Sequence, residues 1–369
     1  MSQVKQHKEP LLRIAKRDTI SHPKAWGIRV VAVLLSLVVS GAFIFAVTKL
    51  NPIQVYNAIF DGAFGTERRS WVTIRDAMML LCIGVGLAPA FKMKFWNIGA
   101  EGQILIGGIV TAGLMRAFGS TLPTPVLLLL MAVMSLLAGC VWGVIPATFK
   151  AVWNTNETLF TLMMNYVAIQ LTSYFVALWE NPIGSNTVGV INQRTRAGWF
   201  PELLGQSYTL NVILVMALAI GMYLYLKYSK QGYEISVVGD SENTARYAGI
   251  NVKKVTIRTM AISGAICGMA GFIEVAGVSH TISTSTAGGR GFTAIIVAWL
   301  AQFNTFVMIL ISFLLVFLQK GATQIASQFN LNDYASNIIT GIILFFILGS
   351  EFFINYRVIV RGGKEGSAK

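Results

Sequence analysis

The sequence predicts an all-α polytopic membrane protein, and composition and apolar run length are the observations behind this fold class. Of the 369 residues, 54% are hydrophobic and only 12% are charged, whereas a soluble domain carries about a quarter charged residues. Runs such as 28–47 and 337–354 approach or reach the ~20 mainly apolar residues that cross a bilayer. Because backbone groups find no water partner in hydrocarbon, these runs must be helices.

About ten apolar segments follow one another along the chain. The segment at 291–303 is short for a full crossing, and only "FNT" separates it from the next one. The segments lie near 28–48, 73–91, 97–118, 125–148, 157–179, 208–227, 257–278, 291–303, 305–319 and 335–355.

The distribution of lysine and arginine predicts the topology, since cytoplasmic loops of membrane proteins are enriched in both residues. Placing both termini in the cytoplasm puts 20 of the 29 basic residues on that side and nine outside. The resulting domains are a basic tail, a transmembrane domain with one long outer and one long inner loop, and a second tail. Their bounds are 1–27, 28–356 with loops 180–207 and 227–256, and 357–369.

Two segments about 190 residues apart share an unusual pattern, in which a polar, Gly-rich piece runs into an apolar helix. They are "FWNIGAEGQILIGGIVTA" (95–112) and "TSTAGGRGFTAIIVAWLA" (284–301). With five spans per half, the two halves have opposite orientations, as in the inverted repeats of many transporters, whose interrupted helices lie near the substrate path. We therefore predict two inverted five-span halves.

Several functions are disfavoured by what the chain lacks. The basic residues are dispersed among the spans, which does not favour nucleic acid as a partner. Cys82, Cys140 and Cys267 lie in apolar segments without metal-ligand spacing, so we expect no metal. No Gly-x-x-x-x-Gly-Lys-Ser/Thr phosphate loop and no Ser/His/Asp grouping occurs, so we expect neither catalysis nor a cofactor in this chain, and any ATP would bind a partner.

A short basic helix is predicted in the inner loop. The stretch "GDSENTARYAGINVKKV" (239–255) begins with an acidic and hydroxyl cluster suited to a helix N-terminus and reaches a stop at Gly249. We expect this helix to seat on a cytoplasmic ATPase, with Ala245 permitting close approach and Gly249 leaving no room for a bulky residue. The residues assigned to coupling are Asp240, Ala245, Arg246 and Gly249. The alternative is a solvated basic loop.

The stretch 237–271 resembles the coupling region of membrane permeases of ATP-binding-cassette (ABC) importers, since Ala245-x-x-x-Gly249 matches the core of their Glu-Ala-Ala loop. Asn243 and Thr244 stand where that family often has Glu and Ala. "FWNIGAEGQILIGG" (95–108), "NETLFTLMMNYVA" (156–168) and "GRGFTAIIVAWLA" (289–301) resemble the branch that imports nucleosides and simple sugars.

The resemblance implies a multi-pass subunit of the bacterial plasma membrane. Its partners would be a second homologous permease, cytoplasmic ATP-binding-cassette ATPases and an extracellular substrate-binding lipoprotein, all in a lipid bilayer. Loop 180–207 is either a docking surface for the lipoprotein or a plain connector. The function expected is half of a translocation path for nucleosides. The alternatives are a permease for simple sugars or branched-chain amino acids, and an ion- or proton-coupled carrier acting alone.

Polar residues inside the predicted spans are the candidates for the path, because charged groups in lipid are costly and face a cavity or a partner. Asn97 and Glu101 could instead cap their own helix, Asn165 could bond a neighbouring helix, and Glu274 could pair with Arg290. The candidates are Asn97, Glu101, Gln103, Asn165, Glu274 and Arg290. "GCVWG" (139–143) and "GAICG" (264–268) predict close helix packing, within this chain or against the partner permease.

Overall fold

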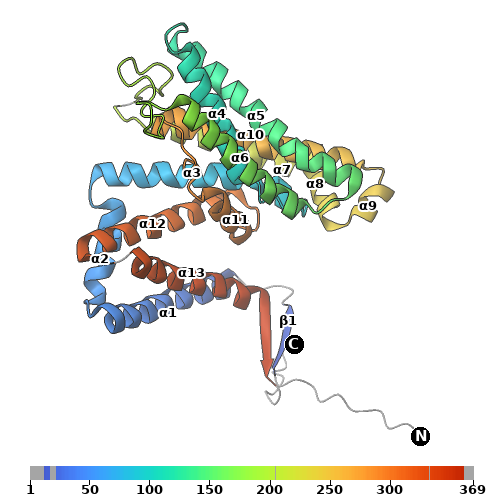
Figure 1. The fold of residues 1–369 in the computed structure, drawn as a ribbon. Helices are drawn as coiled ribbons and strands as arrows, with labels where there is room; N and C mark the ends of the chain where they lie inside the picture. The colour runs from blue at the N-terminus through green and yellow to red at the C-terminus, as the bar shows by residue number, and fades with distance from the viewer. Residues whose placement is uncertain (1–11, 17–21, 204, 332, 361–369) are drawn as a thin grey trace. The chain divides into compact units, whose positions relative to one another are not determined.

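The computed structural model describes residues 12–16, 22–203, 205–331 and 333–360, and helices make up most of them (Figure 1). The helices are α1 (His22–Thr48), α2 (Pro52–Phe64), α3 (Glu67–Lys92), α4 (Ala100–Phe118), α5 (Thr124–Trp153), α6 (Glu157–Trp179), α7 (Thr209–Tyr228), α8 (Lys230–Asp240), α9 (Glu242–Tyr247), α10 (Val252–Glu274), the π-helical turn η1 (Val275–Ser279), α11 (Arg290–Leu300), α12 (Thr305–Phe329) and α13 (Asp333–Asn355).

The fold class is confirmed as helical and polytopic. In the described part of the chain, seven helices are long and apolar enough to cross a membrane. They are α1 from Val30, α3, α5, α6, α7, α10 together with η1, and α12. The number of ten spans and the orientation of the chain stay predictions.

The predicted span at 291–303 contains a helix that is shorter than a membrane crossing. The eighth segment forms α11, which has 11 residues and is therefore about 16 Å long at 1.5 Å per residue. This is roughly half of the 30 Å hydrocarbon core. The chain turns at Gln302 and Phe303, both with positive φ, before α12 begins. Helix α11 alone is too short to cross.

Two elements were not predicted from the sequence. Helix α2 has 13 residues and starts at an Asn-Pro pair, where the Asn51 side chain accepts a hydrogen bond from the amide of Ile53 at 2.9 Å. Strands β1 (Leu12–Lys16) and β2 (Tyr356–Val360) pair in antiparallel register, with Leu12 opposite Val360. The all-α prediction therefore needs a small correction.

The chain divides into two compact units. One unit comprises residues 66–316 and carries every predicted path and coupling residue. The other combines the described residues of 1–65 and 317–369, and in it α1 packs against α13.

The centre of unit 66–316 is α10, which packs against α3, α4 and α5. The two Gly-x-x-x-Gly motifs lie at the α5–α10 contact, because a Cβ atom added to Gly139 would overlap the carbonyl oxygen of Gly264, and one added to Gly268 would overlap that of Ser135. The predicted close packing is confirmed, and it occurs inside this chain.

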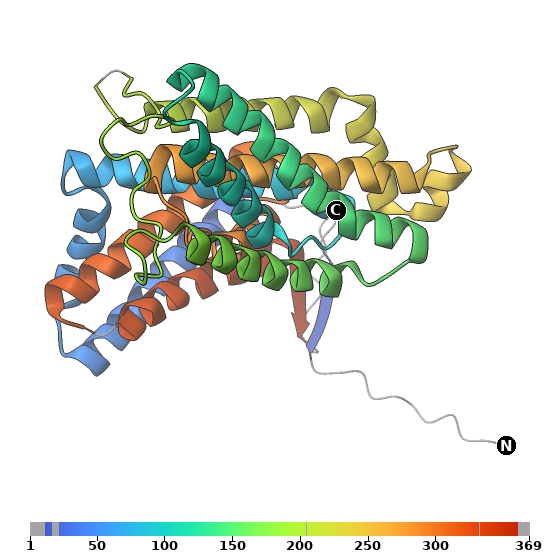
Figure 2. The ribbon, with the colours of Figure 1, turned by 45° about the horizontal axis from the view of Figure 1, so that its top comes forward.

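Helix α5 and the pair α10–η1 run the length of unit 66–316. They have 30 and 28 residues, or about 45 and 42 Å. In Figure 2, α8 and α9 lie at one end of this unit and the loop 180–207 lies at the other. The ends of α3 and α5 and the start of α10 meet α9 around one cavity, so the segments predicted to be cytoplasmic gather at the same end.

Candidate functional site

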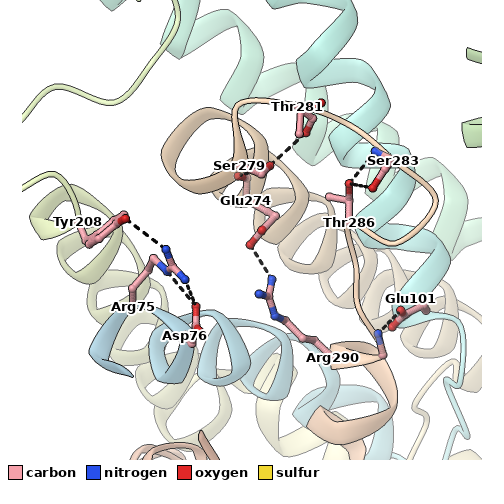
Figure 3. Close-up of polar contacts among 11 residues, drawn as sticks. Arg75, Asp76, Glu101, Tyr208, Glu274, Ser279, Thr281, Ser283, Thr286 and Arg290 are labelled. Atoms are coloured by element: carbon pink, nitrogen blue, oxygen red, sulfur yellow. Dashed lines mark hydrogen bonds and ion pairs between the residues drawn. The ribbon is translucent and has the colours of Figure 1, made fainter. Parts of the chain in front are cut away.

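Two interrupted helices meet at Glu101. Its Oε1 accepts a hydrogen bond from the amide of Gly289 at 2.7 Å (Figure 3), and its Oε2 accepts one from the amide of Gly291 at 2.8 Å. These amides lie at the N-terminus of α11, where Gly289 supplies no side-chain cap. Glu101 therefore caps α11 rather than its own helix, and its negative charge faces the positive dipole ends of both helices.

The start of α4 is held by Asn165 of α6. The Asn165 Oδ1 atom accepts a hydrogen bond from the amide of Gly102 at 2.8 Å, and its Nδ2 donates to the carbonyl of Ile98 at 2.9 Å. The structure thus places Asn165 in contact with a neighbouring interrupted helix, where it satisfies backbone groups that no α-helical bond reaches.

Asn97 and Gln103 form a second buried polar group. Asn97 Nδ2 donates to Ser263 Oγ of α10 at 3.2 Å and to Gln103 Oε1 at 3.4 Å, and its Oδ1 accepts from the amide of Gly99 at 3.0 Å. The bond between Asn97 and Gly99 closes a turn that precedes α4, and no side chain caps the first turn of α4 itself. Asn97 therefore does not act as the N-cap of α4. Both side chains are buried in this conformation.

Glu274 and Arg290 form an ion pair, with Arg290 Nη1 2.6 Å from Glu274 Oε2 (Figure 3). Glu274 is the last residue of α10 and directly precedes η1, and π-helical turns occur frequently at functional sites. Arg290 opens α11, so the pair joins two elements that flank the irregular segment 280–289.

A further pair of charges, which the sequence predictions do not include, lies on α3. Arg75 Nη2 lies 2.8 Å from Asp76 Oδ1, and Arg75 Nη1 donates to the hydroxyl of Tyr208 at 3.2 Å (Figure 3). The sequence did indicate this pair, because both charged residues lie inside the second predicted apolar segment, which begins near residue 73. Charges in a span indicate a cavity or a partner. Arg75 is therefore a further candidate for the path, beside the Glu274–Arg290 pair.

The segment 281–289 leads from η1 to α11 without helical structure. Ser283 and Thr286 hydrogen-bond each other, with the Ser283 amide donating to Thr286 Oγ1 at 2.8 Å, while Thr284 and Ser285 are exposed. Gly288 and Gly289 have φ angles of 61° and 73°. Non-helical backbone at membrane depth is tolerated only inside protein or along a water-filled cavity. The segment is therefore a candidate for the lining of a path.

An aromatic cluster lies beside the other end of α11. The rings of Trp96 and Trp299 stack with centroids 5.3 Å apart, and Phe91 meets both edge-on. Trp96 precedes α4 and Trp299 lies in the last turn of α11, so the two interrupted helices are joined at this level as well as at Glu101. Both tryptophans lie within the quoted repeats, but the sequence gave no reason to pair them.

The predicted short helix is present as α9. It has six residues, with Ser241 Oγ accepting from the amide of Thr244 at 3.3 Å and Glu242 in the first turn. The chain turns at Gly249, whose φ is 77°. Asp240 is the last residue of α8. A short helix that stops at Gly249 is confirmed.

The structure changes the interpretation of two residues in this region. Ala245 is fully buried and so faces its own chain. A Cβ atom on Gly249 would meet nothing within 4 Å, so the residues of this chain leave space around Gly249 and do not produce the expected clash. Within this chain, glycine is favoured at this position by its left-handed backbone conformation. The outward-facing residues of α9 include Arg246 and Tyr247, and Tyr247 is 94% exposed.

Residues 72–348 match the family model described as "Branched-chain amino acid transport system / permease component". The chain belongs to this family of ABC permeases. The permease is therefore a multi-pass protein of the cytoplasmic membrane and a non-catalytic subunit of a transport system. No solved structure matches it.

Three relatives show how far the similarity extends. The glucose ABC transporter permease TsgB13 of Haloferax volcanii is 29% identical over 96% of both chains. The guanosine ABC transporter permease NupP of Bacillus subtilis is 30% identical over 87% of this permease and 92% of its own length. The guanosine ABC transporter permease NupQ of the same bacterium is 27% identical, over 60% and 72%.

Proposed function

We propose that this ABC importer permease forms half of a translocation path for nucleosides. The observation that carries the proposal is the meeting of two interrupted helices at Glu101, beside the irregular segment 281–289. Interrupted helices near a substrate path are typical of transporters. The remaining path candidates, Asn97, Gln103, Asn165, Glu274 and Arg290, surround this junction, and most of them hold the interrupted helices in place.

The proposed topology has ten spans in two inverted five-span halves, with both termini in the cytoplasm. In this arrangement α4 crosses together with residues 95–99, and α11 crosses together with residues 281–289. The gathering of Lys94, Lys150 and Lys253 around one cavity beside α9 supports the assignment of that end to the cytoplasm.

Single cysteines at two exposed positions test the topology. Ile183 is 93% exposed in the loop 180–207 and Tyr233 is 68% exposed on α8, away from the proposed ATPase contact on α9. Ile183→Cys should react with a membrane-impermeant maleimide in intact cells, whereas Tyr233→Cys should react only after the cells are opened. The wild type controls for Cys82, Cys140 and Cys267. Reaction of both variants from the same side would contradict the ten-span arrangement.

The charges of the junction support an uncharged substrate. Arg75 pairs with Asp76, Arg290 pairs with Glu274, and the Glu101 carboxylate is bonded to two amides. A path whose charges are already paired offers little to an ionic substrate. Among the relatives, NupP and NupQ carry guanosine in their names and TsgB13 carries glucose, which supports nucleosides first and simple sugars second.

The proposed partners are an ATPase that contacts α9, a second permease and a lipoprotein that docks on loop 180–207. Two guanosine permeases of one bacterium are both similar to this chain, which supports pairing with a homologous second permease. Asp240 and Gly249 would fix the ends of the ATPase-contacting region, Ala245 would hold α9 to the permease, and Arg246 would face the ATPase.

Uptake by the native complex tests the proposed function. The importer, purified through a tag on this chain and reconstituted in liposomes with ATP on the cytoplasmic side, should accumulate [³H]adenosine or [³H]guanosine faster than [¹⁴C]glucose or [¹⁴C]leucine. A preference for glucose would select the sugar alternative. Uptake by the isolated chain without any ATPase would contradict the importer assignment.

A further inference from the structure

A cavity of about 520 Å³ lies at the end of unit 66–316 opposite α9. Its walls come from the start of α5, from the loop before α7, and from η1 with His280. The volume falls in the range of small-molecule sites, roughly 300–1,000 Å³. None of the residues selected from the sequence lines this cavity.

An aromatic pair forms one wall. The rings of Trp199 and His280 stack in parallel, with centroids 3.7 Å apart and an interplanar angle of 3°. Trp199 is fixed by a hydrogen bond from its Nε1 to the carbonyl of Ile191 at 2.9 Å. Burial lowers the pKa of His280 below its usual 6.5, so the ring is neutral at pH 7. A rigid, neutral aromatic wall favours flat, uncharged ligands.

The polar groups of the cavity balance in charge. Among the described lining residues the charged side chains are Arg196 and Glu202, which lie 3.8 Å apart. Ser207 and Tyr208 add hydroxyl groups. A pocket with one positive and one negative charge offers hydrogen bonds to ribose hydroxyls, but it provides no excess positive charge for the phosphates of a nucleotide.

The cavity adjoins the Arg75–Asp76 ion pair through Tyr208. Tyr208 lines it and accepts the hydrogen bond from Arg75 at 3.2 Å. Gly277 of η1 also lines it, and a Cβ atom on Gly277 would lie 2.6 Å from Oδ1 of Asn211. Within the described part of the chain, the buried amide of Asn211 and the buried Nδ1 of His280 have no hydrogen-bond partner. Unpartnered buried polar groups are rare, and here they lie beside a π-helical turn.

We propose that this cavity is an outer binding site for a nucleoside, which the permease holds before the solute reaches the Glu274–Arg290 pair. The base packs against the face of the Trp199 ring that His280 leaves uncovered, and it displaces the exposed Arg196 guanidinium, which lies 5.9 Å from the ring centroid. The ribose hydroxyls bond Arg196 and Glu202. The assignment rests on the proposed import of nucleosides and adds a site to it.

Photolabelling of the assembled importer tests this site with 8-azidoadenosine as the probe. In native membranes the probe should label this chain between residues 191 and 208 or between 275 and 280, and excess adenosine should suppress the labelling. Trp199→Ala should lower labelling about tenfold or more, because stacking of a base on an aromatic ring is worth about 1–3 kcal/mol. Trp199→Phe should retain most of it.

Two further variants separate binding from folding. Trp153→Ala removes an exposed tryptophan at the other end of α5 and should leave labelling unchanged. The double variant Arg196→Gln, Glu202→Gln changes side chains that are 70% and 58% exposed, so the fold should persist while labelling falls.

The outcomes distinguish the site from the function. Normal adenosine uptake by the wild-type importer, with labelling outside the cavity or unaffected by Trp199→Ala, would overturn the outer site alone. Absence of any nucleoside uptake would overturn the proposed function, and with it the site. Suppression of the labelling by glucose but not by adenosine would overturn the nucleoside assignment of the cavity.

Discussion

Glu101→Ala should abolish uptake and destabilise the permease. The carboxylate accepts two backbone hydrogen bonds at 2.7 and 2.8 Å, and bonds to charged groups are worth about 1.5–3 kcal/mol each. Truncation leaves the amides of Gly289 and Gly291 without this acceptor at a helix N-terminus inside the protein. Glu101→Gln keeps one acceptor oxygen, so its stability and its uptake should fall between those of the wild type and those of Glu101→Ala. Thermal unfolding of the purified importer and ATP-dependent uptake measure both effects.

Glu67→Ala is the matched control. Glu67 is exposed and accepts one hydrogen bond from Gln206 at 3.0 Å, so its removal should change stability by less than about 1 kcal/mol. If Glu101→Ala were as stable as the wild type and changed only substrate preference, the carboxylate would act as a direct ligand of the solute rather than as the link between α4 and α11.

Interrupted helices could be predicted from the sequence, but their meeting could not. A polar, Gly-rich start before an apolar run is visible in both repeats, and the structure has helices beginning at Ala100 and Arg290. The contact between Glu101 and Gly289 spans 188 residues. A local pattern cannot specify which of two distant N-termini a carboxylate caps, so the sequence offered only the path and its own helix as interpretations of Glu101.

The sequence also does not determine which face of a short helix packs against the rest of the protein. The start of α9 at the Ser241 cap and the turn at Gly249 follow from local chemistry. The burial of Ala245 and the exposure of Tyr247 follow from packing against other elements. Arg75 and Asp76 were missed for a similar reason, since a charged pair at the edge of an apolar run reads equally well as the end of a span.

Strands β1 and β2 illustrate a competing signal. "LRIAK" at 12–16 and "YRVIV" at 356–360 contain apolar residues at alternating positions, which is typical of a half-buried strand. The basic residues of both segments instead favoured cytoplasmic tails under the topology rule. Pairing between residues more than 300 positions apart leaves no local trace that outweighs such a rule.

Tyr247→Ala should uncouple the importer without removing the permease from the membrane. Tyr247 is 94% exposed at the end of α9, and tyrosines contribute strongly when buried at interfaces, with losses of about 2 kcal/mol or more on truncation. Such a loss weakens ATPase binding about 30-fold. Substrate-stimulated ATP hydrolysis and uptake should both fall, while the amount of inserted permease stays normal, because Tyr247 makes little contact within its own chain.

An exposed tyrosine far from α9 provides the control for Tyr247→Ala. Tyr174 is 63% exposed on α6, and Tyr174→Ala should leave ATP hydrolysis coupled to uptake.

Gly249→Trp should also reduce coupling. The new side chain meets open space in this chain, but a tryptophan at a φ of 77° stores about 1–3 kcal/mol of backbone strain. It should therefore displace α9 and obstruct the ATPase. Full uptake by both Tyr247→Ala and Gly249→Trp would exclude α9 as the ATPase contact.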